Sequence, residues 1–442
     1  MAVVAGYDGL TDDQHGAALR KAVIAATVGT TIEWYDFFLY GTAAGLIFPK
    51  LFFPNADPVT GTLAALSTYF VGFVGRPIGA AIFGHYGDRV GRKATLLATL
   101  MLMGIATFLI AFVPTYGSIG IWGAVILTAL RMLQGIGAGG EWGGSVLIAM
   151  EWARGHRNRG FIAAWPQFGV PGGLFLANLV VLAVSAWSGP DFAVWGWRVP
   201  FLLSIVLIGI GFWIRVGILE TPVFRQLVAT QRIEQAPLVE VIRRQPREIV
   251  LSALLRMSEQ APFYIFTVFV FTYGTGALKM PRDLVLGAVL VAAALSFVVV
   301  PLAGHISDRI GRRKMYMIGA AATGLFGFLY FGMLDSATPA VVFIAISLSL
   351  IPHNLQYGPQ AALIAEAFTP RLRCAGASLG YQLASIVAGG PAPLIATALF
   401  AHYHSGYAIA VYIAACAVIS LIAAALMPDH TGKDVSAEYE GT

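Results

Sequence analysis

Apolar runs recur along the chain with short polar stretches between them, and an α-helix needs about 20 such residues to cross a hydrocarbon core about 30 Å thick. We count twelve runs, from residues 22–48 at the start to residues 407–427 at the end. Only 12% of the residues are charged, about half the usual share in soluble domains. A soluble globule of this composition would have to expose apolar side chains widely. The sequence therefore predicts an all-α integral membrane protein with twelve transmembrane helices, and it excludes a soluble enzyme.

Lys and Arg residues lie mostly on one side of the predicted spans. Of the 28, 21 fall on the side of both termini, 4 on the opposite side, and three within spans, namely Arg76, Arg131 and Arg256. Cytoplasmic loops carry this excess, so we expect both termini in the cytoplasm. The net charge of +5 thus indicates orientation in a lipid bilayer, with no nucleic-acid partner. The first 19 residues hold no Lys or Arg, so we expect an uncleaved first helix rather than a signal peptide.

The longest hydrophilic connection divides the spans six and six. Its mixture of charged and aliphatic residues predicts short amphipathic helices on the cytoplasmic surface. The expected organisation is a cytoplasmic tail at residues 1–21, an N-terminal six-helix bundle at 22–218, the linker at 219–248, a C-terminal bundle at 249–427 and a cytoplasmic tail at 428–442.

The two halves repeat each other. The stretch Gly84 to Lys93 after the second span recurs as Gly304 to Lys314 after the eighth, so that Asp88 and Asp308 lie 220 residues apart. Two six-helix halves in one orientation predict a parallel repeat, with a pseudo-two-fold axis along the membrane normal and a substrate path between the halves.

The doubled G-x-x-x-D-R-x-G-R-[KR] loop on a six-plus-six frame resembles the major facilitator superfamily, and the resemblance covers nearly the whole chain. More specific stretches resemble its metabolite:H⁺ symporters, the subgroup containing shikimate, α-ketoglutarate, citrate and proline/betaine permeases. These stretches are Glu33 to Gly41, Gly75 to Gly79, Arg131 to Gly135, Gly139 to Gly144 and Trp195 to Phe201. The resemblance implies a secondary active transporter of a bacterial inner membrane that works by alternating access.

Two acids in the first span are candidates for proton coupling. Glu33 and Asp36 are three residues apart and project in neighbouring directions from one helix. Charges at this depth are costly and usually functional, and a carboxylate in a site of low dielectric constant can take up and release a proton. Arg131 in the fourth span is the natural counter-charge, and the resemblance implies the same role for Asp36 and Arg131. The alternative is a permanent ion pair that packs the two spans.

The seventh span carries its own charged pair, Arg256 and Glu259. Because this span is equivalent to the first, we expect both residues at the central path. The planar guanidinium suits a substrate carboxylate, and the alternative is an internal pair on one helix. Further candidates for substrate contact are polar or aromatic groups in path-lining spans, namely Tyr35, Tyr40, Trp165, Gln167, Gln260, Tyr264, Asn354, Tyr357, Tyr381 and Gln382.

Other polar residues in the spans have more ordinary interpretations. His353 beside Pro352 could titrate near neutral pH, but we expect a packing residue. Glu141 among glycines could relay protons, although hydrogen bonding between helices is the preferred interpretation. Arg76 before Pro77 fits a snorkelling or kink-stabilising residue better than a binding one.

Charged residues of the cytoplasmic loops are expected to form a gate that holds this face shut. Such surface pairs contribute only about 0 to 1 kcal/mol each, so substrate binding could open the network. The expected members are Asp88, Arg92, Glu151 and Arg159 in the first half, and Asp308, Arg312, Glu366 and Arg373 in the second.

The preferred function is proton-coupled import of a small organic acid by a monomer. One rival is a proton-coupled transporter of an osmolyte such as proline or betaine, and another is a sensor that binds a metabolite without moving it. A third is an efflux antiporter, because Gly169 to Gly173 partly resembles an element of drug exporters. The chain carries no HExxH, GxSxG or nucleotide-binding loop, so no enzyme activity, cofactor or metal site is expected.

Overall fold

The computed structural model describes residues 12–152, 158–217 and 237–431, and every regular element among them is a helix. In the N-terminal half the long helices are α1 (Asp12–Leu46), α3 (Pro58–Arg89), α4 (Arg92–Ile110), α6 (Trp122–Trp152), α7 (Arg159–Ser188) and α8 (Arg198–Val216). Short helices α2 (Phe48–Phe52), α5 (Tyr116–Ile119) and η1 (Gly189–Ala193) lie in the connections between them.

The C-terminal half is more interrupted. After α10 (Pro237–Arg244), one crossing consists of α11 (Pro246–Leu255), α12 (Met257–Tyr264), η2 (Ile265–Phe269), α13 (Val270–Thr272) and η3 (Tyr273–Ala277). Then follow α14 (Arg282–Ile310), α15 (Arg312–Leu334), α16 (Pro339–Leu348) with α17 (Leu350–Glu366), α18 (Arg373–Ala384) with η4 (Ser385–Gly389) and α19 (Ala392–Tyr403), and α20 (Gly406–Leu426).

Nine continuous helical stretches of the described residues are long and apolar enough to cross a membrane. Helices α1 and α6 are also long enough, with 35 and 31 residues, but charged groups such as Glu33, Asp36, Arg131 and Glu141 lower their hydropathy. The interrupted crossing from α11 to η3 completes the set of twelve predicted spans. The molecule is therefore an all-helical protein with many membrane spans, as the sequence predicts.

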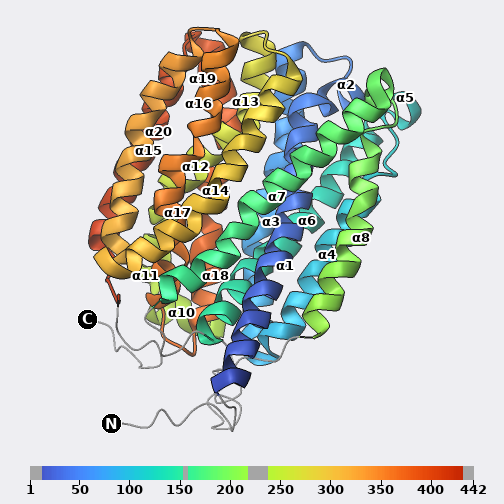
Figure 1. The fold of residues 1–442 in the computed structure, drawn as a ribbon. Helices are drawn as coiled ribbons and strands as arrows, with labels where there is room; N and C mark the ends of the chain where they lie inside the picture. Colours follow the sequence, from blue (N-terminus) through green and yellow to red (C-terminus); the bar gives the residue numbers. More distant parts are fainter. Residues whose placement is uncertain (1–11, 153–157, 218–236, 432–442) are drawn as a thin grey trace, which may run out of the picture.

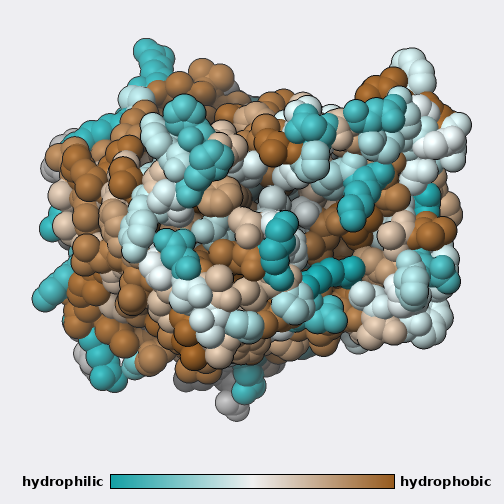
Figure 2. Space-filling model, turned by 90° about the horizontal axis from the view of Figure 1, so that it is seen from above, coloured by the Kyte–Doolittle hydropathy of each residue, from teal (hydrophilic) through white to brown (hydrophobic). Residues whose placement is uncertain are grey.

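The two halves stand side by side as separate bundles (Figure 1), with α1 to α8 in blue to green and α11 to α20 in yellow to red. Helix α1 begins, and α20 ends, at the same end of the molecule. Seen from the opposite end, hydrophilic residues are spread over the surface between hydrophobic ones (Figure 2). Large apolar side chains such as Trp213, Leu325 and Trp187 are mostly exposed, as expected of a surface that faces lipid rather than water.

Glycines allow the closest helix contact in the N-terminal half. On α3 and α6, a Cβ atom added at Gly79 would overlap the carbonyl oxygen of Ile136, and one added at Gly139 would overlap that of Arg76. Small residues at such crossings let backbones approach within a bilayer, where apolar burial alone does not hold helices together. This contact fixes α3 beside α6, and with it the two central arginines, Arg76 and Arg131.

Candidate functional site

Two buried arginines of the N-terminal half meet at one aromatic ring. The guanidinium carbon of Arg131 on α6 lies 3.8 Å from the ring centre of Phe37, and that of Arg76 on α3 lies 4.0 Å from it. Tyr40 and Tyr69 also border Arg131, each with its ring centre 4.5 Å from the guanidinium carbon. Such contacts stabilise a cation through the ring face, so aromatic side chains partly replace an acidic partner here.

Neither arginine pairs with a carboxylate among the described residues. Arg131 donates from Nη1 to Gln134 Oε1 at 3.0 Å, and its Nε and Nη2 have no hydrogen-bond partner there. The Nε and Nη2 of Arg76 likewise have none. Both side chains are fully buried. A buried guanidinium without an anion is costly, so each of these arginines has donors in place for an acceptor from outside the chain.

Asp36 is fully buried on α1. Its Oδ1 accepts a hydrogen bond of 2.8 Å from Ser204 of α8, and its Oδ2 has no partner in the described part of the chain. The direct ion pair with Arg131 expected from the sequence does not form in this structure, although the arginine acts electrostatically on the carboxylate. Gln134 links the two regions, because it also donates to Thr107 at 2.6 Å, and Thr107 lies beside Asp36.

A second group of charges lies between α1, α6 and α8. Glu141 forms an ion pair with Arg215 and accepts hydrogen bonds from Thr99 at 3.0 Å and Ser145 at 2.9 Å, which agrees with hydrogen bonding between helices. Glu33 is buried nearby, and its Oε2 has no partner among the described residues. Arg215, one of the 21 basic residues that the sequence places on the side of the termini, is 1% exposed.

In the C-terminal half, Arg256 pairs with Glu259 on the same helix. Its Nε donates to Glu259 Oε2 at 3.1 Å, and the Nη2 to Oε2 distance is 2.9 Å. The guanidinium also lies over the ring of Tyr381 at 3.1 Å and donates to the Tyr381 carbonyl oxygen. The structure thus has the internal pair that the sequence left open as the alternative, and the guanidinium of Arg256 already has an anionic partner.

The helix breaks at Arg256, between α11 and α12. The hydroxyl of Tyr316 donates to the carbonyl oxygen of Leu255, and Ser420 Oγ donates to that of Leu254 at 3.0 Å. Ser420 Oγ also accepts from the backbone N–H of Ser258 at 2.8 Å. These contacts satisfy the backbone groups that the break frees. Broken helices near the middle of a membrane are typical of binding sites in transporters.

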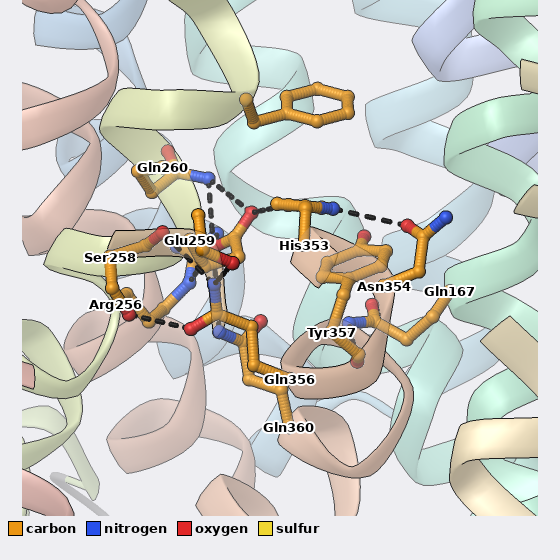
Figure 3. Close-up of polar contacts among 12 residues, drawn as sticks. Gln167, Arg256, Ser258, Glu259, Gln260, His353, Asn354, Gln356, Tyr357 and Gln360 are labelled. Carbon is orange, nitrogen blue, oxygen red and sulfur yellow. Dashed lines mark hydrogen bonds and ion pairs between the residues drawn. The ribbon is translucent and has the colours of Figure 1, made fainter. Parts of the chain in front are cut away.

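Glu259 is the centre of a polar cluster (Figure 3). Gln260 Nε2 donates to both carboxylate oxygens, at 3.1 and 3.2 Å, and Gln360 Nε2 donates to Oε2 at 3.4 Å. His353 Nε2 lies 3.7 Å from Oε1. Beside the histidine, Asn354 donates to Ser296 at 2.7 Å. The cluster draws on α12, α14 and α17.

Aromatic rings close the space between the two halves. Tyr264 of α12 lies with its ring centre 4.9 Å from that of Phe73 and 6.2 Å from that of Tyr69, both on α3. Phe263 lies 5.6 Å from Phe38 of α1. The hydroxyl of Tyr264 is buried and has no partner among the described residues. It therefore lies next to both the arginines of one half and the polar cluster of the other.

Gln167 and Tyr381 also join the halves. Gln167 Oε1 accepts from Trp142 Nε1 at 2.9 Å, and its Nε2 donates to the carbonyl oxygen of Tyr357 at 3.4 Å. Trp142 stacks on Tyr381 with ring centres 3.7 Å apart. Gln382 donates to the carbonyl oxygens of α6 at Ala138 and Gly139, both at 3.5 Å. The hydroxyls of Tyr357 and Tyr381 are buried without a described partner.

Three other predicted residues lie in helix contacts away from this cluster. Tyr35 donates to the carbonyl oxygen of Pro200 at 2.7 Å and Tyr40 to Thr68 at 2.8 Å, so both hydroxyls are occupied inside the N-terminal bundle. Trp165 is partly exposed and packs its ring against Phe161 and Phe168.

Charged residues of the predicted gate join the halves at the end where α7 begins. Asp308 accepts from the backbone N–H groups of Gly160 at 2.8 Å and Phe161 at 3.0 Å, at the start of α7. Glu366 forms ion pairs with Arg312 and, at 3.6 Å, with Arg159 of the other half. Arg373 instead donates to the carbonyl oxygens of Ala365 and Phe368. The side chains of Asp88, Arg92 and Glu151 lie outside what the structure describes.

Sequence reasoning assigned no binding role to Arg76, and it expected packing for His353. Arg76 precedes a proline within a predicted span, which suggested snorkelling or stabilisation of a kink, yet it is 0% exposed. One feature of the sequence could have indicated its burial. Arg76 lies about three helical turns before Asp88, near which the loop begins. That distance places Arg76 inside the hydrocarbon region rather than at its edge.

Comparison with known proteins agrees with this architecture. The family model described as "Major Facilitator Superfamily" matches residues 26–373 and 283–441. The chain is 42% identical over 411 residues to the inner membrane metabolite transport protein YhjE of Escherichia coli, covering 91% of this chain and 93% of that protein. It is 38% identical over 415 residues to the shikimate transporter of the same species (93% and 94% covered) and 31% identical over 428 residues to its proline/betaine transporter (94% and 84%). A solved structure of the proton:xylose symporter XylE shares the fold, with a TM-score of 0.76, 19% identity and coverage of 96% and 98%.

Proposed function

Because this chain belongs to the major facilitator superfamily and is a multi-pass metabolite transporter, we propose that it imports a small organic acid together with protons across a bacterial inner membrane. The two bundles rock against each other and expose the central site to one side at a time. The single observation that carries the proposal is the pair of arginines, Arg76 and Arg131, which are buried at the centre without a carboxylate partner among the described residues.

The charges of the N-terminal bundle support an anionic substrate. Apart from Arg159, which pairs with the other half, its described spans bury three arginines and three carboxylates: Arg76, Arg131, Arg215, Glu33, Asp36 and Glu141. When all six side chains are ionised, their net charge is zero. When one carboxylate binds a proton, a net positive charge is left at the centre, and a substrate carboxylate compensates it. Proton and anion therefore favour each other's binding, as symport requires.

Asp36 is the carboxylate best suited to carry that proton. Unlike Glu141, it has no ion-pair partner among the described residues, and one of its oxygens has no hydrogen-bond partner. Glu33 is the second candidate, since it too lacks an ion pair there. In this mechanism Asp36 takes the proton from the outer side, the substrate anion then binds to the arginines, and both leave on the cytoplasmic side.

The polar contacts that join the two halves at the end where α7 begins must break when the transporter changes between its two states. Asp308 of α14 accepts hydrogen bonds from the start of α7, and Glu366 lies 3.6 Å from Arg159 of the other half, which is too far for a strong hydrogen bond. Substrate binding at the centre shifts the balance by its differential affinity for the two states. In the proposed mechanism, further residues complete the substrate site. They are Gln167 from the first half and Arg256, Glu259, Gln260, Tyr264 and Tyr381 from the second.

An osmolyte such as betaine is the second candidate, because a relative transports proline and betaine. Its cationic group would need a free aromatic face. Phe37, however, already faces the guanidiniums of Arg76 and Arg131, which repel a second cation. The same aromatic cluster therefore favours an acid over a zwitterion.

The test is uptake into proteoliposomes with labelled shikimate, α-ketoglutarate and betaine, each with and without an inwardly directed proton gradient. We expect at least one of the two acids to accumulate only with the gradient, and betaine not to accumulate. Accumulation of betaine alone would replace the organic-acid proposal with the osmolyte one. Uptake of an acid that does not respond to the gradient would contradict proton coupling.

A further inference from the structure

His353 is enclosed in the C-terminal half, with an amide oxygen at Nδ1 and a carboxylate oxygen facing Nε2 beyond hydrogen-bond distance. Its side chain is 1% exposed, and its ring stacks between Phe263 of α12 and Tyr357, with ring centres 4.9 and 5.3 Å away. Nδ1 lies 3.1 Å from Asn354 Oδ1, and Nε2 lies 3.7 Å from Glu259 Oε1. Figure 3 shows the histidine between these two neighbours.

The hydrogen-bond directions fix which nitrogen carries a proton. Ser296 has a single hydroxyl hydrogen and donates it to the carbonyl oxygen of Ala292 at 2.8 Å. Ser296 can therefore only accept from Asn354, whose Nδ2 lies 2.7 Å away. The amide oxygen of Asn354 then faces His353 Nδ1, and because an amide oxygen only accepts, Nδ1 must be the donor.

With the hydrogen on Nδ1, neutral histidine presents the lone pair of Nε2 to a carboxylate oxygen of Glu259. Two acceptors facing each other in a buried site repel, and Nε2 is left without a hydrogen-bond partner among the described residues. One additional proton removes the conflict, whether it is held by Nε2 or by the carboxyl group. We propose that His353 and Glu259 share this proton and form a proton-binding site of the C-terminal half, separate from Asp36.

The charges around the pair determine what the proton does. Arg256, at the break before α12, already neutralises Glu259 through an ion pair. The other titratable groups beside the pair in the described part of the chain are four tyrosine hydroxyls, all neutral near pH 7: Tyr264 on α12, Tyr316 on α15, Tyr357 on α17 and Tyr381 on α18. The shared proton therefore gives the cluster a net charge of one positive unit. This positive charge attracts the substrate anion, a consequence that rests on the proposed function. The shared proton itself does not depend on any substrate.

The experiment is infrared difference spectroscopy of the full chain in nanodiscs, with isotope-labelled histidine and without substrate, between about pH 5 and about pH 8, where histidine changes charge. The chain has 8 histidines, so the His353 signal is the difference between the unaltered protein and His353→Gln. We expect one imidazole per protein to change between its neutral and protonated forms. Glu259→Gln removes this change from the pH range, because the neutral amide needs no proton at Nε2.

Glu259→Asp provides the second variant if Glu259→Gln fails to fold, because it keeps the negative charge beside Arg256 while withdrawing it from His353. It should also reduce the His353 signal. Glu240→Gln on α10, a partly exposed residue that pairs with Arg244, is the matched control and leaves the signal unchanged. Asp36→Asn should leave it unchanged as well, so failure of the proposed function does not affect this test. A His353 ring that stays neutral throughout, or a signal equal in the unaltered protein and both Glu259 variants, would overturn the shared proton.

Discussion

Replacing Arg76 by Gln should weaken substrate binding without unfolding the protein. Two buried nitrogens of Arg76, Nε and Nη2, form no hydrogen bond with a described residue that the variant would break. The guanidinium loses its contacts with the rings of Trp34, Phe37 and Phe73. The variant also avoids the cost of burying a charge that has no anionic partner in the described part of the chain, so the two effects offset each other. Arg256→Gln is the opposite case, because it leaves the Glu259 carboxylate buried without its cation.

The expected magnitudes separate the two variants. A hydrogen bond to a charged group contributes about 1.5 to 3 kcal/mol, and about 1.4 kcal/mol corresponds to a tenfold change in affinity. Loss of the Arg76 contact to a substrate carboxylate should therefore weaken binding about 10- to 150-fold. Breaking a buried ion pair by removing one partner costs about 3 to 5 kcal/mol of stability, which is the expectation for Arg256→Gln.

The assay is equilibrium binding of the acid that the uptake panel identifies, together with thermal unfolding of the same samples in detergent. Arg76→Gln should lose affinity at an unchanged unfolding midpoint, and Arg76→Lys, which keeps the charge, should lose less. Arg256→Gln should lower the midpoint. An Arg76→Gln variant with unaltered affinity, or one as unstable as Arg256→Gln, would show that Arg76 is a structural residue.

Three further changes test the fold and the gate. Gly79→Ala places a methyl group against the Ile136 carbonyl oxygen and should lower stability by about 1 to 3 kcal/mol through overpacking. The control is Gly209→Ala, whose added methyl group meets open space and should not lower stability. Asp308→Asn weakens the contact with the start of α7 and should therefore speed thiol labelling of Cys374, whose Sγ faces Gly87 of α3. Labelling of Cys416 is the internal control. A rate that stays constant would argue against the gate. Hydrogen bonds from Thr60 and the backbone lower the pKa of Asp57 at the start of α3, so its stabilising effect is present above the ordinary pKa and lost as pH falls through the lowered one. Asp57→Ala should therefore reduce thermal stability at neutral pH and match the unaltered protein in acid, and a pH-independent difference would refute this reasoning.

The sequence predicted the helical membrane architecture because hydrocarbon thickness alone requires long apolar runs. It also located the central charges on α1, α6 and α12, since a charged residue in such a run stands out. It could not predict the break at Arg256, because the hydroxyls that satisfy the freed carbonyl oxygens come from Tyr316 and Ser420 on distant helices. Nothing local marks that position as a helix end.

Pairing of charges was the least predictable feature. Asp36 and Arg131 were expected to form an ion pair. In this structure Ser204 donates a hydrogen bond to the Asp36 carboxylate instead. The guanidinium of Arg131 contacts Phe37, Tyr40 and Gln134. Pairing depends on how α1 is rotated against α6, which the pattern of charges along the chain does not specify. Charge patterns along a chain show which groups are buried, but the approach of the helices decides which groups touch.

Proton movement during transport tests the central claim most directly. Proteoliposomes loaded in weak buffer are mixed with the identified acid, supplied as its anion, while an electrode follows the external pH. The account predicts that the external medium becomes alkaline as the acid enters, and that Asp36→Asn abolishes this signal while exchange of labelled for unlabelled acid continues. Uptake of the acid without any external pH change in the unaltered protein, or an unchanged signal in Asp36→Asn, would contradict the account.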